Sequence, residues 1–133
     1  ALMRSQVPDG DLATILEAAV TEKLERLEAR RFGRTGHPTK TLEKTETAPR
    51  SRHVPAVVRR VVAQRDGTGC GYVDERGRRC SERHRVELHH RYPFGRGGDH
   101  SPPNIGLLCR AHNAMLAEHD YGGAAIARNR SSG

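Results

Sequence analysis

The chain has 133 residues and a formal net charge of +7, and only 35% of its residues are hydrophobic and 4% aromatic. This length accommodates one small domain with appendages, and the low apolar content excludes a large hydrophobic core, so we expect a bound metal to help hold the fold. No stretch is apolar enough for a transmembrane helix, and the N-terminal residues lack the apolar core of a signal peptide, so we expect a cytoplasmic, intracellular protein with no membrane partner.

The positive charge is carried almost entirely by arginine, because lysine occurs only at positions 23, 40 and 44. Arginine makes bidentate contacts with phosphate, and a net charge of this sign favours a polyanionic partner such as DNA. The alternative is an ordinary solvated basic surface. Seven arginines lie among the motifs described below and are candidates for contacts with a DNA backbone: Arg78, Arg79, Arg83, Arg85, Arg91, Arg96 and Arg110.

Residues 1–32 form the first segment, in which the sequence predicts an amphipathic helix over residues 9–32. Asp11 is suited to cap the start of this helix, and Gly33 is suited to end it. The apolar residues that recur at helical spacing are Leu12, Ile15, Leu16, Ala19, Leu24 and Leu27. Such a stripe needs a partner, which could be the rest of the chain, a second copy in a homodimer, or an upstream domain. Because the chain begins with Ala, we expect it to be a fragment that continues an upstream region.

Residues 33–52 are rich in threonine, proline and charge, and we predict a flexible linker. Residues 53–122 are predicted to form the main domain, and residues 123–133 a disordered tail. The domain should begin with a short helix whose apolar face is Val57, Val58, Val61 and Val62. A hairpin over residues 70–80 with its turn at Asp74–Gly77, a strand ending at Pro93, a Gly/Pro-rich loop, a second short strand (IGLL) and a closing helix should follow.

The three cysteines and most of the histidines lie in the same part of the chain, which points to metal binding. In a hairpin symmetric about Glu75, Cys70 and Cys80 would face each other at about 4.5–5.5 Å. Cys109 and His112 are three residues apart at a predicted helix start, so they share a face. These four residues predict a closed, structural Cys₃His zinc site. The alternative is a Cys70–Cys80 disulfide with Cys109 as an ordinary buried thiol.

Residues 51–122 contain a further pattern: RDGTGC, then ELHHRYPFGRGG with its histidine pair, then PPN, then LLCRAHN at a helix start. This order and spacing resemble the HNH endonucleases. The resemblance implies an α+β fold, namely a small zinc-bound ββα-metal domain (His-Me finger, treble-clef-like) that cradles one divalent cation. It also implies a bacterial protein, because the preceding helical segment is similar to sequences found upstream of such domains in bacteria.

By this resemblance, His90 is the general base that deprotonates the attacking water, and His89 is a ligand of the catalytic cation. Asn104 organises the loop that orients the base. Asn113 stands where many members have His and is the second cation ligand, so the chain is an H-N-N variant. Two neutral ligands imply weak cation binding that DNA completes; Mg²⁺ is expected by analogy, and an imidazole ligand also suits Mn²⁺ or Ni²⁺. Two further histidines could join the site, His100 and His119.

The predicted function is metal-dependent hydrolysis of DNA phosphodiester bonds, for which a neutral imidazole is a suitable base near pH 7. By the resemblance, the products carry 5′-phosphate and 3′-hydroxyl ends. Adjacent strand residues point to opposite faces, so His89 and His90 can serve one site only if the strand bends or ends there. The alternative function is a zinc-stabilised nucleic-acid-binding module without catalysis, which the loss of the final His favours.

Overall fold

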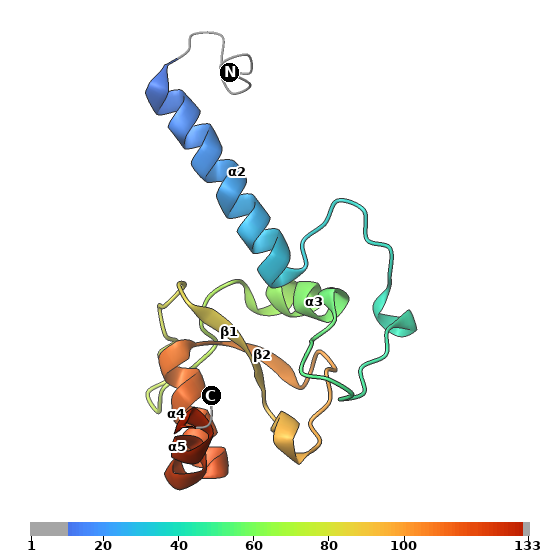
Figure 1. Ribbon diagram of the computed structural model, residues 1–133, viewed down its shortest axis with the longest axis vertical. Helices are drawn as coiled ribbons and strands as arrows, with labels where there is room; N and C mark the ends of the chain where they lie inside the picture. The colour runs from blue at the N-terminus through green and yellow to red at the C-terminus, as the bar shows by residue number, and fades with distance from the viewer. Residues whose placement is uncertain (1–10, 132–133) are drawn as a thin grey trace.

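The structure, a computed structural model, describes residues 11–131 and has an α+β fold, as predicted. Four α-helices and a two-stranded antiparallel sheet make up the described regular structure, with two short 3₁₀ segments, η1 (Leu42–Lys44) and η2 (Phe94–Arg96) (Figure 1). The helices are α2 (Leu12–Phe32), α3 (Ala56–Asp66), α4 (Arg110–Tyr121) and α5 (Gly123–Ser131), and the strands are β1 (Val86–His90) and β2 (Ile105–Cys109). Within residues 11–131, no helix is both long enough and apolar enough to cross a membrane.

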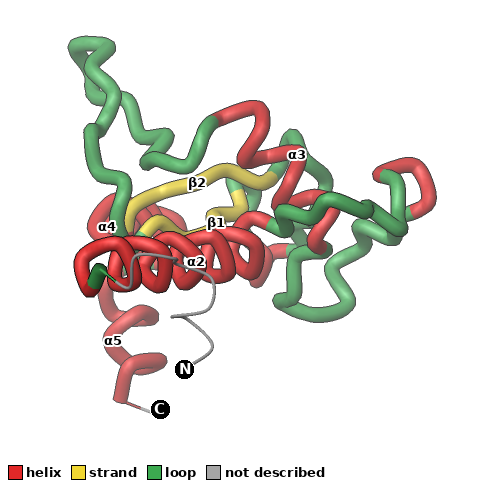
Figure 2. The backbone as a smooth tube through the Cα atoms, turned by 90° about the horizontal axis from the view of Figure 1, so that it is seen from above, coloured by secondary structure: helices red, strands yellow, loops and turns green. Residues whose placement is uncertain are grey.

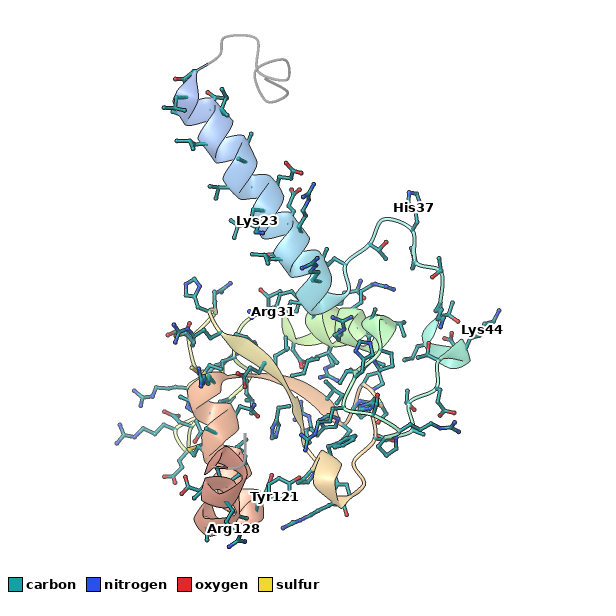
Figure 3. The ribbon with its side chains drawn as sticks, in the orientation of Figure 1. Lys23, Arg31, His37, Lys44, Tyr121 and Arg128 are labelled. Atoms are coloured by element: carbon teal, nitrogen blue, oxygen red, sulfur yellow. The ribbon has the colours of Figure 1, made fainter. Side chains whose placement is uncertain are left out.

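Helix α2 begins after Asp11 and ends before Gly33, the two capping residues that the sequence predicts, and the predicted residues 9 and 10 lie outside the described residues. The Asp11 carboxylate accepts hydrogen bonds from the backbone N–H and the hydroxyl of Thr14, and Gly33 ends the helix with a left-handed φ of 63°. The C-terminal end of the helix packs against the domain, where Phe32 is buried. The rest of the helix projects outward, with Lys23 on the projecting part and Arg31 near the domain (Figure 3).

The apolar stripe of α2 is therefore exposed rather than covered by the described part of the chain. Ile15 is partly buried, but four other members and the neighbouring Val20 expose between 48% and 68% of their surface: Leu12, Leu16, Val20, Leu24 and Leu27. The rest of the described chain thus does not cover this apolar stripe, although it was one of the three partners expected from the sequence. A second copy and an upstream domain remain as predictions.

The main core lies between α3 and one face of the sheet. Three of the four valines predicted as the apolar face of α3 are buried, and only Val61 is partly exposed. They pack with residues of α2 and of both strands, and the buried cluster comprises Phe32, Val54, Val57, Val58, Val62, Val86, Ile105 and Leu107. This core is small, as the composition predicts.

The two strands lie side by side, and their register runs from Val86 opposite Cys109 to His90 opposite Ile105 (Figure 2). Because side chains alternate along a strand, Val86, Leu88 and His90 share the face that packs on α3. Glu87 and His89 point to the other face, on the side of α4. The register thus divides the two adjacent histidines between the faces of the sheet.

Residues 33–52 contain no described α-helix or strand and form a long loop beside α3 (Figure 1). The loop nevertheless contacts the domain, because Leu42 packs against the core and the Thr47 carbonyl accepts a hydrogen bond from the backbone N–H of His100 at 2.8 Å. Its flexibility as a linker stays a prediction.

The C-terminal end differs from the sequence expectation. In place of a disordered tail, residues 123–131 form α5, which follows α4 after a bend at Gly122. The segment is rich in alanine, which has the highest helix propensity, and Ala125 and Ile126 are partly buried. Residues 132 and 133 lie outside the described residues.

Candidate functional site

The hairpin over residues 70–80 has its turn at Asp74–Gly77, as the sequence predicts. The Asp74 carbonyl accepts from the Gly77 N–H at 2.9 Å, and the Asp74 carboxylate accepts from the backbone N–H groups of Arg76 and Arg78 at 2.9 Å each. Gly77 has a φ of 76°, which inserts one extra residue on its side of the hairpin. The hairpin is therefore centred on Arg76, and the prediction of symmetry about Glu75 is wrong.

Because of this shift, Cys70 and Cys80 do not face each other directly across the hairpin. The Cys80 N–H donates to the Tyr72 carbonyl, and the Cys70 N–H donates to the Glu82 carbonyl, both at 2.8 Å. The two cysteines come together because both side chains reach toward the start of α4.

The four predicted zinc ligands form one cluster. The ligand atoms of Cys70, Cys80, Cys109 and His112 all lie within 4.8 Å of one another, close enough to bind a metal such as zinc. His112 Nδ1 lies 3.5 Å from Cys70 Sγ and 3.2 Å from Cys109 Sγ. A tetrahedral zinc separates neighbouring S and N ligands by about 3.5 Å, given bonds of about 2.3 and 2.0–2.1 Å. All three cysteines are free thiols, so the alternative Cys70–Cys80 disulfide is not formed.

The surroundings of the cluster suit a structural metal. The Tyr72 ring stacks on the His112 ring with 3.9 Å between centroids, which fixes the imidazole orientation. Cys109 is the N-cap of α4, and a helix N-terminus favours a thiolate. One metal at this point would join the hairpin, β2 and α4, which share few other buried side chains.

His89 and Asn113 meet on the α4 face of the sheet, although 24 residues separate them. His89 Nδ1 lies 3.0 Å from Asn113 Oδ1, and Asn113 Nδ2 donates to Glu87 Oε2 at 2.7 Å, which fixes the orientation of the amide. Two neighbouring ligands of an octahedral cation with bonds of about 2.1 Å are about 3.0 Å apart. The Asn113 oxygen only accepts, so the contact is a hydrogen bond in which the His89 Nδ1–H donates, and the same two atoms could hold one divalent cation only with Nδ1 deprotonated.

His90 lies on the opposite face of β1. Its Nε2 is 3.0 Å from His100 Nδ1, and its ring packs near Phe94 with 5.6 Å between centroids. The strand does not bend between the two histidines, because His89 and His90 both pair in the ladder with β2. His89 lines a cavity of about 550 Å³, and His90 lines a different one of about 330 Å³.

The pKa of His90 is held below its ordinary value of 6.5, chiefly by burial. Electrostatic interactions with His100, His89 and Arg52 lower this pKa further, and the interaction with Asp99 opposes the shift. The imidazole is therefore neutral near pH 7, which is the form that can accept a proton.

Asn104 closes the loop between the strands. Its side-chain NH₂ donates to the carbonyls of Asp99 at 2.8 Å and Tyr92 at 3.3 Å, and its Oδ1 accepts from the Tyr92 N–H at 2.7 Å. This is the geometry of a loop organiser, and its effect on the base stays a prediction.

Some predicted DNA-contacting arginines are engaged within the chain. Arg79 donates to the carbonyls of Cys70 and Asp66, Arg78 pairs with the Asp74 carboxylate at 3.0 Å, and Arg96 donates to the Asp120 carbonyl. These three side chains contribute to the fold, whatever else they do.

Sequence reasoning missed Glu87 and gave His100 too little weight. Glu87 could have been found, because it stands two residues before His89 and therefore shares its face. The contacts of His100 arise from residues 10 and 49 positions away, which no local pattern reveals. His119 does not join the site, since its side chain is 84% exposed.

Comparisons of the chain with protein-family models, curated proteins and solved structures found no match.

Proposed function

We propose that this chain is a metal-dependent DNA endonuclease of the HNH type. His90 accepts a proton from the attacking water, His89 and Asn113 hold one divalent cation, and the Cys/His cluster holds a structural zinc. The observation that carries the proposal is the 3.0 Å approach of His89 Nδ1 and Asn113 Oδ1, with a neutral imidazole on the next residue along the strand.

The opposite orientations of His89 and His90 are compatible with one substrate. Strand β1 ends at His90, and consecutive residues are separated by only about 3.3 Å along a strand. Among the described strands, β2 is the one neighbour of β1, so the edge of β1 that faces away from β2 has no strand paired to it. A phosphate lying across the end of β1 would approach one histidine from each face.

The catalytic cation would supply positive charge at the scissile phosphate. In this chain, His89 and Asn113 would hold it, while Glu87 keeps the Asn113 oxygen turned toward His89. Both ligand groups are neutral, so binding without DNA should be weak. Mg²⁺ is the expected ion, and the imidazole ligand would also accept Mn²⁺ or Ni²⁺.

A second candidate is a zinc-stabilised nucleic-acid-binding module without catalysis. Two observations favour it: the neutral Asn113 at the last motif position, and the separate cavities of His89 and His90. The net charge of +7 suits either function.

Cleavage and binding of DNA by three proteins distinguish the two candidates: the unsubstituted chain, His90→Ala, and His84→Ala as a control on an exposed histidine. The endonuclease predicts that His90→Ala loses about 10²–10⁴-fold in nicking rate while DNA affinity is nearly unchanged, and that His84→Ala resembles the unsubstituted chain. DNA binding without cleavage in Mg²⁺, Mn²⁺ or Ni²⁺ would support the binding module instead.

We also propose that α2 pairs with α2 of a second copy in antiparallel orientation. The stripe is exposed, and its flanking charges are self-complementary. Residues 12–22 carry only negative charges, Glu17 and Glu22, whereas the last turn carries Arg30 and Arg31. An antiparallel pair therefore sets acidic residues against basic ones.

A further inference from the structure

His100 is the one described polar or charged residue that is buried, with 2% of its surface exposed. It lies in the loop between η2 and β2, and each of its N–H or ring nitrogen positions has a partner. The backbone N–H donates to the Thr47 carbonyl at 2.8 Å, Nε2 lies 2.7 Å from the Ser51 carbonyl oxygen, and Nδ1 lies 3.0 Å from His90 Nε2. A buried histidine with this set of partners is fixed in position.

These contacts determine where the protons lie when both rings are neutral. A carbonyl oxygen only accepts, so His100 Nε2 carries a hydrogen and donates to Ser51. A neutral imidazole has one N–H, so His100 Nδ1 must be an acceptor. His90 Nε2 therefore carries the hydrogen that it donates to His100, and the lone pair of His90 is on Nδ1.

Aromatic contacts hold the pair from the side. The Phe94 ring is nearly parallel to His100 at 5.8 Å between centroids, and the Arg52 guanidinium lies over the Phe94 ring at 5.3 Å. Arg52 and Ser51 both belong to the segment before α3. The environment of His90 is thus built partly by residues that precede the predicted domain boundary at residue 53.

We propose that His100 is a positioning residue, which holds His90 in the tautomer whose Nδ1 accepts the proton of the attacking water, and that the Ser51 carbonyl anchors it. This inference rests on the proposed function. In the step concerned, the water proton passes to His90 Nδ1 and the water oxygen forms a bond to phosphorus. The bond from phosphorus to O3′ breaks, and O3′ leaves with the electron pair and takes a proton from solvent.

Two amide substitutions separate this role from simple support of the loop. In His100→Asn, Oδ1 replaces the Nδ1 acceptor for His90, and the bond to Ser51 is lost. In His100→Gln, Nε2 keeps the donor to Ser51, and no acceptor replaces Nδ1. We expect His100→Asn to nick plasmid at least about ten times faster than His100→Gln, with the difference in kcat and little in KM, because correct general-base catalysis contributes about 10²–10⁴-fold. His84→Asn is the matched control and should resemble the unsubstituted chain. Equal loss in both His100 variants, or faster cleavage by the Gln variant, would overturn the proposal.

Nitrogen NMR of the unsubstituted, zinc-loaded chain gives a second test, which needs neither a folded variant nor activity. We expect His90 to show a protonated Nε2 and an unprotonated Nδ1, and His100 to show the same pattern. A protonated Nδ1 on neutral His90 would overturn the proposal. If the chain has the expected tautomers and does not cleave DNA, the proposed function fails while the assignment of the hydrogen bonds stands.

Discussion

Metal removal should unfold the part of the molecule that contains the hairpin and α4, whereas β2 also packs in the main core through Ile105 and Leu107. Among the described residues, the second buried cluster contains three buried side chains, two of them cysteines of the metal site (Cys70 and Cys109, with Leu108), and Tyr72, Cys80 and Leu116 pack partly buried against it. Burying one leucine side chain contributes about 1.5–3 kcal/mol, whereas a structural zinc contributes roughly 10–16 kcal/mol near neutral pH. Because small domains have a total stability of about 5–15 kcal/mol, this region depends on the metal.

The assay combines elemental analysis with thermal unfolding followed by circular dichroism. The unsubstituted chain should hold about one zinc per molecule. Cys80→Ser should lose the zinc and the cooperative transition, as should the unsubstituted chain treated with a strong chelator. Ser81→Ala changes an exposed neighbour and should keep both. A zinc-free chain that unfolds cooperatively at an unchanged temperature would refute the reasoning.

The remaining predictions concern the turn, the end of α3 and the projecting helix. Gly77→Ala should lower the free energy of unfolding by about 1 kcal/mol, because Gly77 has a φ of 76°, which disfavours a residue with a Cβ. Gly36→Ala is the control and should change the stability little, because nothing lies within 4 Å of an added Cβ. Thermal unfolding of the two variants and the unsubstituted chain measures the difference. The Asp66 carboxylate accepts hydrogen bonds from Arg65, which lowers the pKa of Asp66 in the folded chain. The Asp66 carboxylate therefore stabilises the fold at pH values above the ordinary pKa of an aspartate. This stabilisation is lost as the pH falls through the lowered pKa of the folded chain. Asp66→Asn should therefore destabilise the chain at neutral pH and much less in acid. A difference in the free energy of unfolding between the two proteins that stays the same at every pH would contradict this. Leu24→Glu should convert a dimer into a monomer in sedimentation; a monomeric unsubstituted chain would refute pairing through α2.

The features that the sequence predicted correctly depend on local signals. Asp11 and Gly33 set the ends of α2 through their own side-chain and backbone preferences. The Cys₃His cluster follows from residue types and from the turn and helix start that carry them. The period of two gave the condition under which His89 and His90 could share a site, but the alternation alone did not show whether the strand bends there.

The features that it missed depend on backbone detail or on distant contacts. The left-handed Gly77 centres the hairpin on Arg76 instead of Glu75, so Cys70 pairs with Glu82 and not with Cys80. His100 acquires its partners from the loop before α3 and from the end of β1, and both contacts exist only in the folded chain. That most of the α2 stripe is exposed likewise became visible only in the folded chain, because helical spacing alone does not show what lies against the helix.

The most direct test of the proposed endonuclease is the conversion of supercoiled plasmid to nicked circles by the purified, zinc-loaded chain, with and without added Mg²⁺. The proposal predicts nicking that requires the added cation, leaves 5′-phosphate ends and disappears in His90→Ala. Nicking that persists undiminished in folded His90→Ala would contradict the assignment of the base, and the absence of nicking in Mg²⁺, Mn²⁺ and Ni²⁺ would contradict the endonuclease itself.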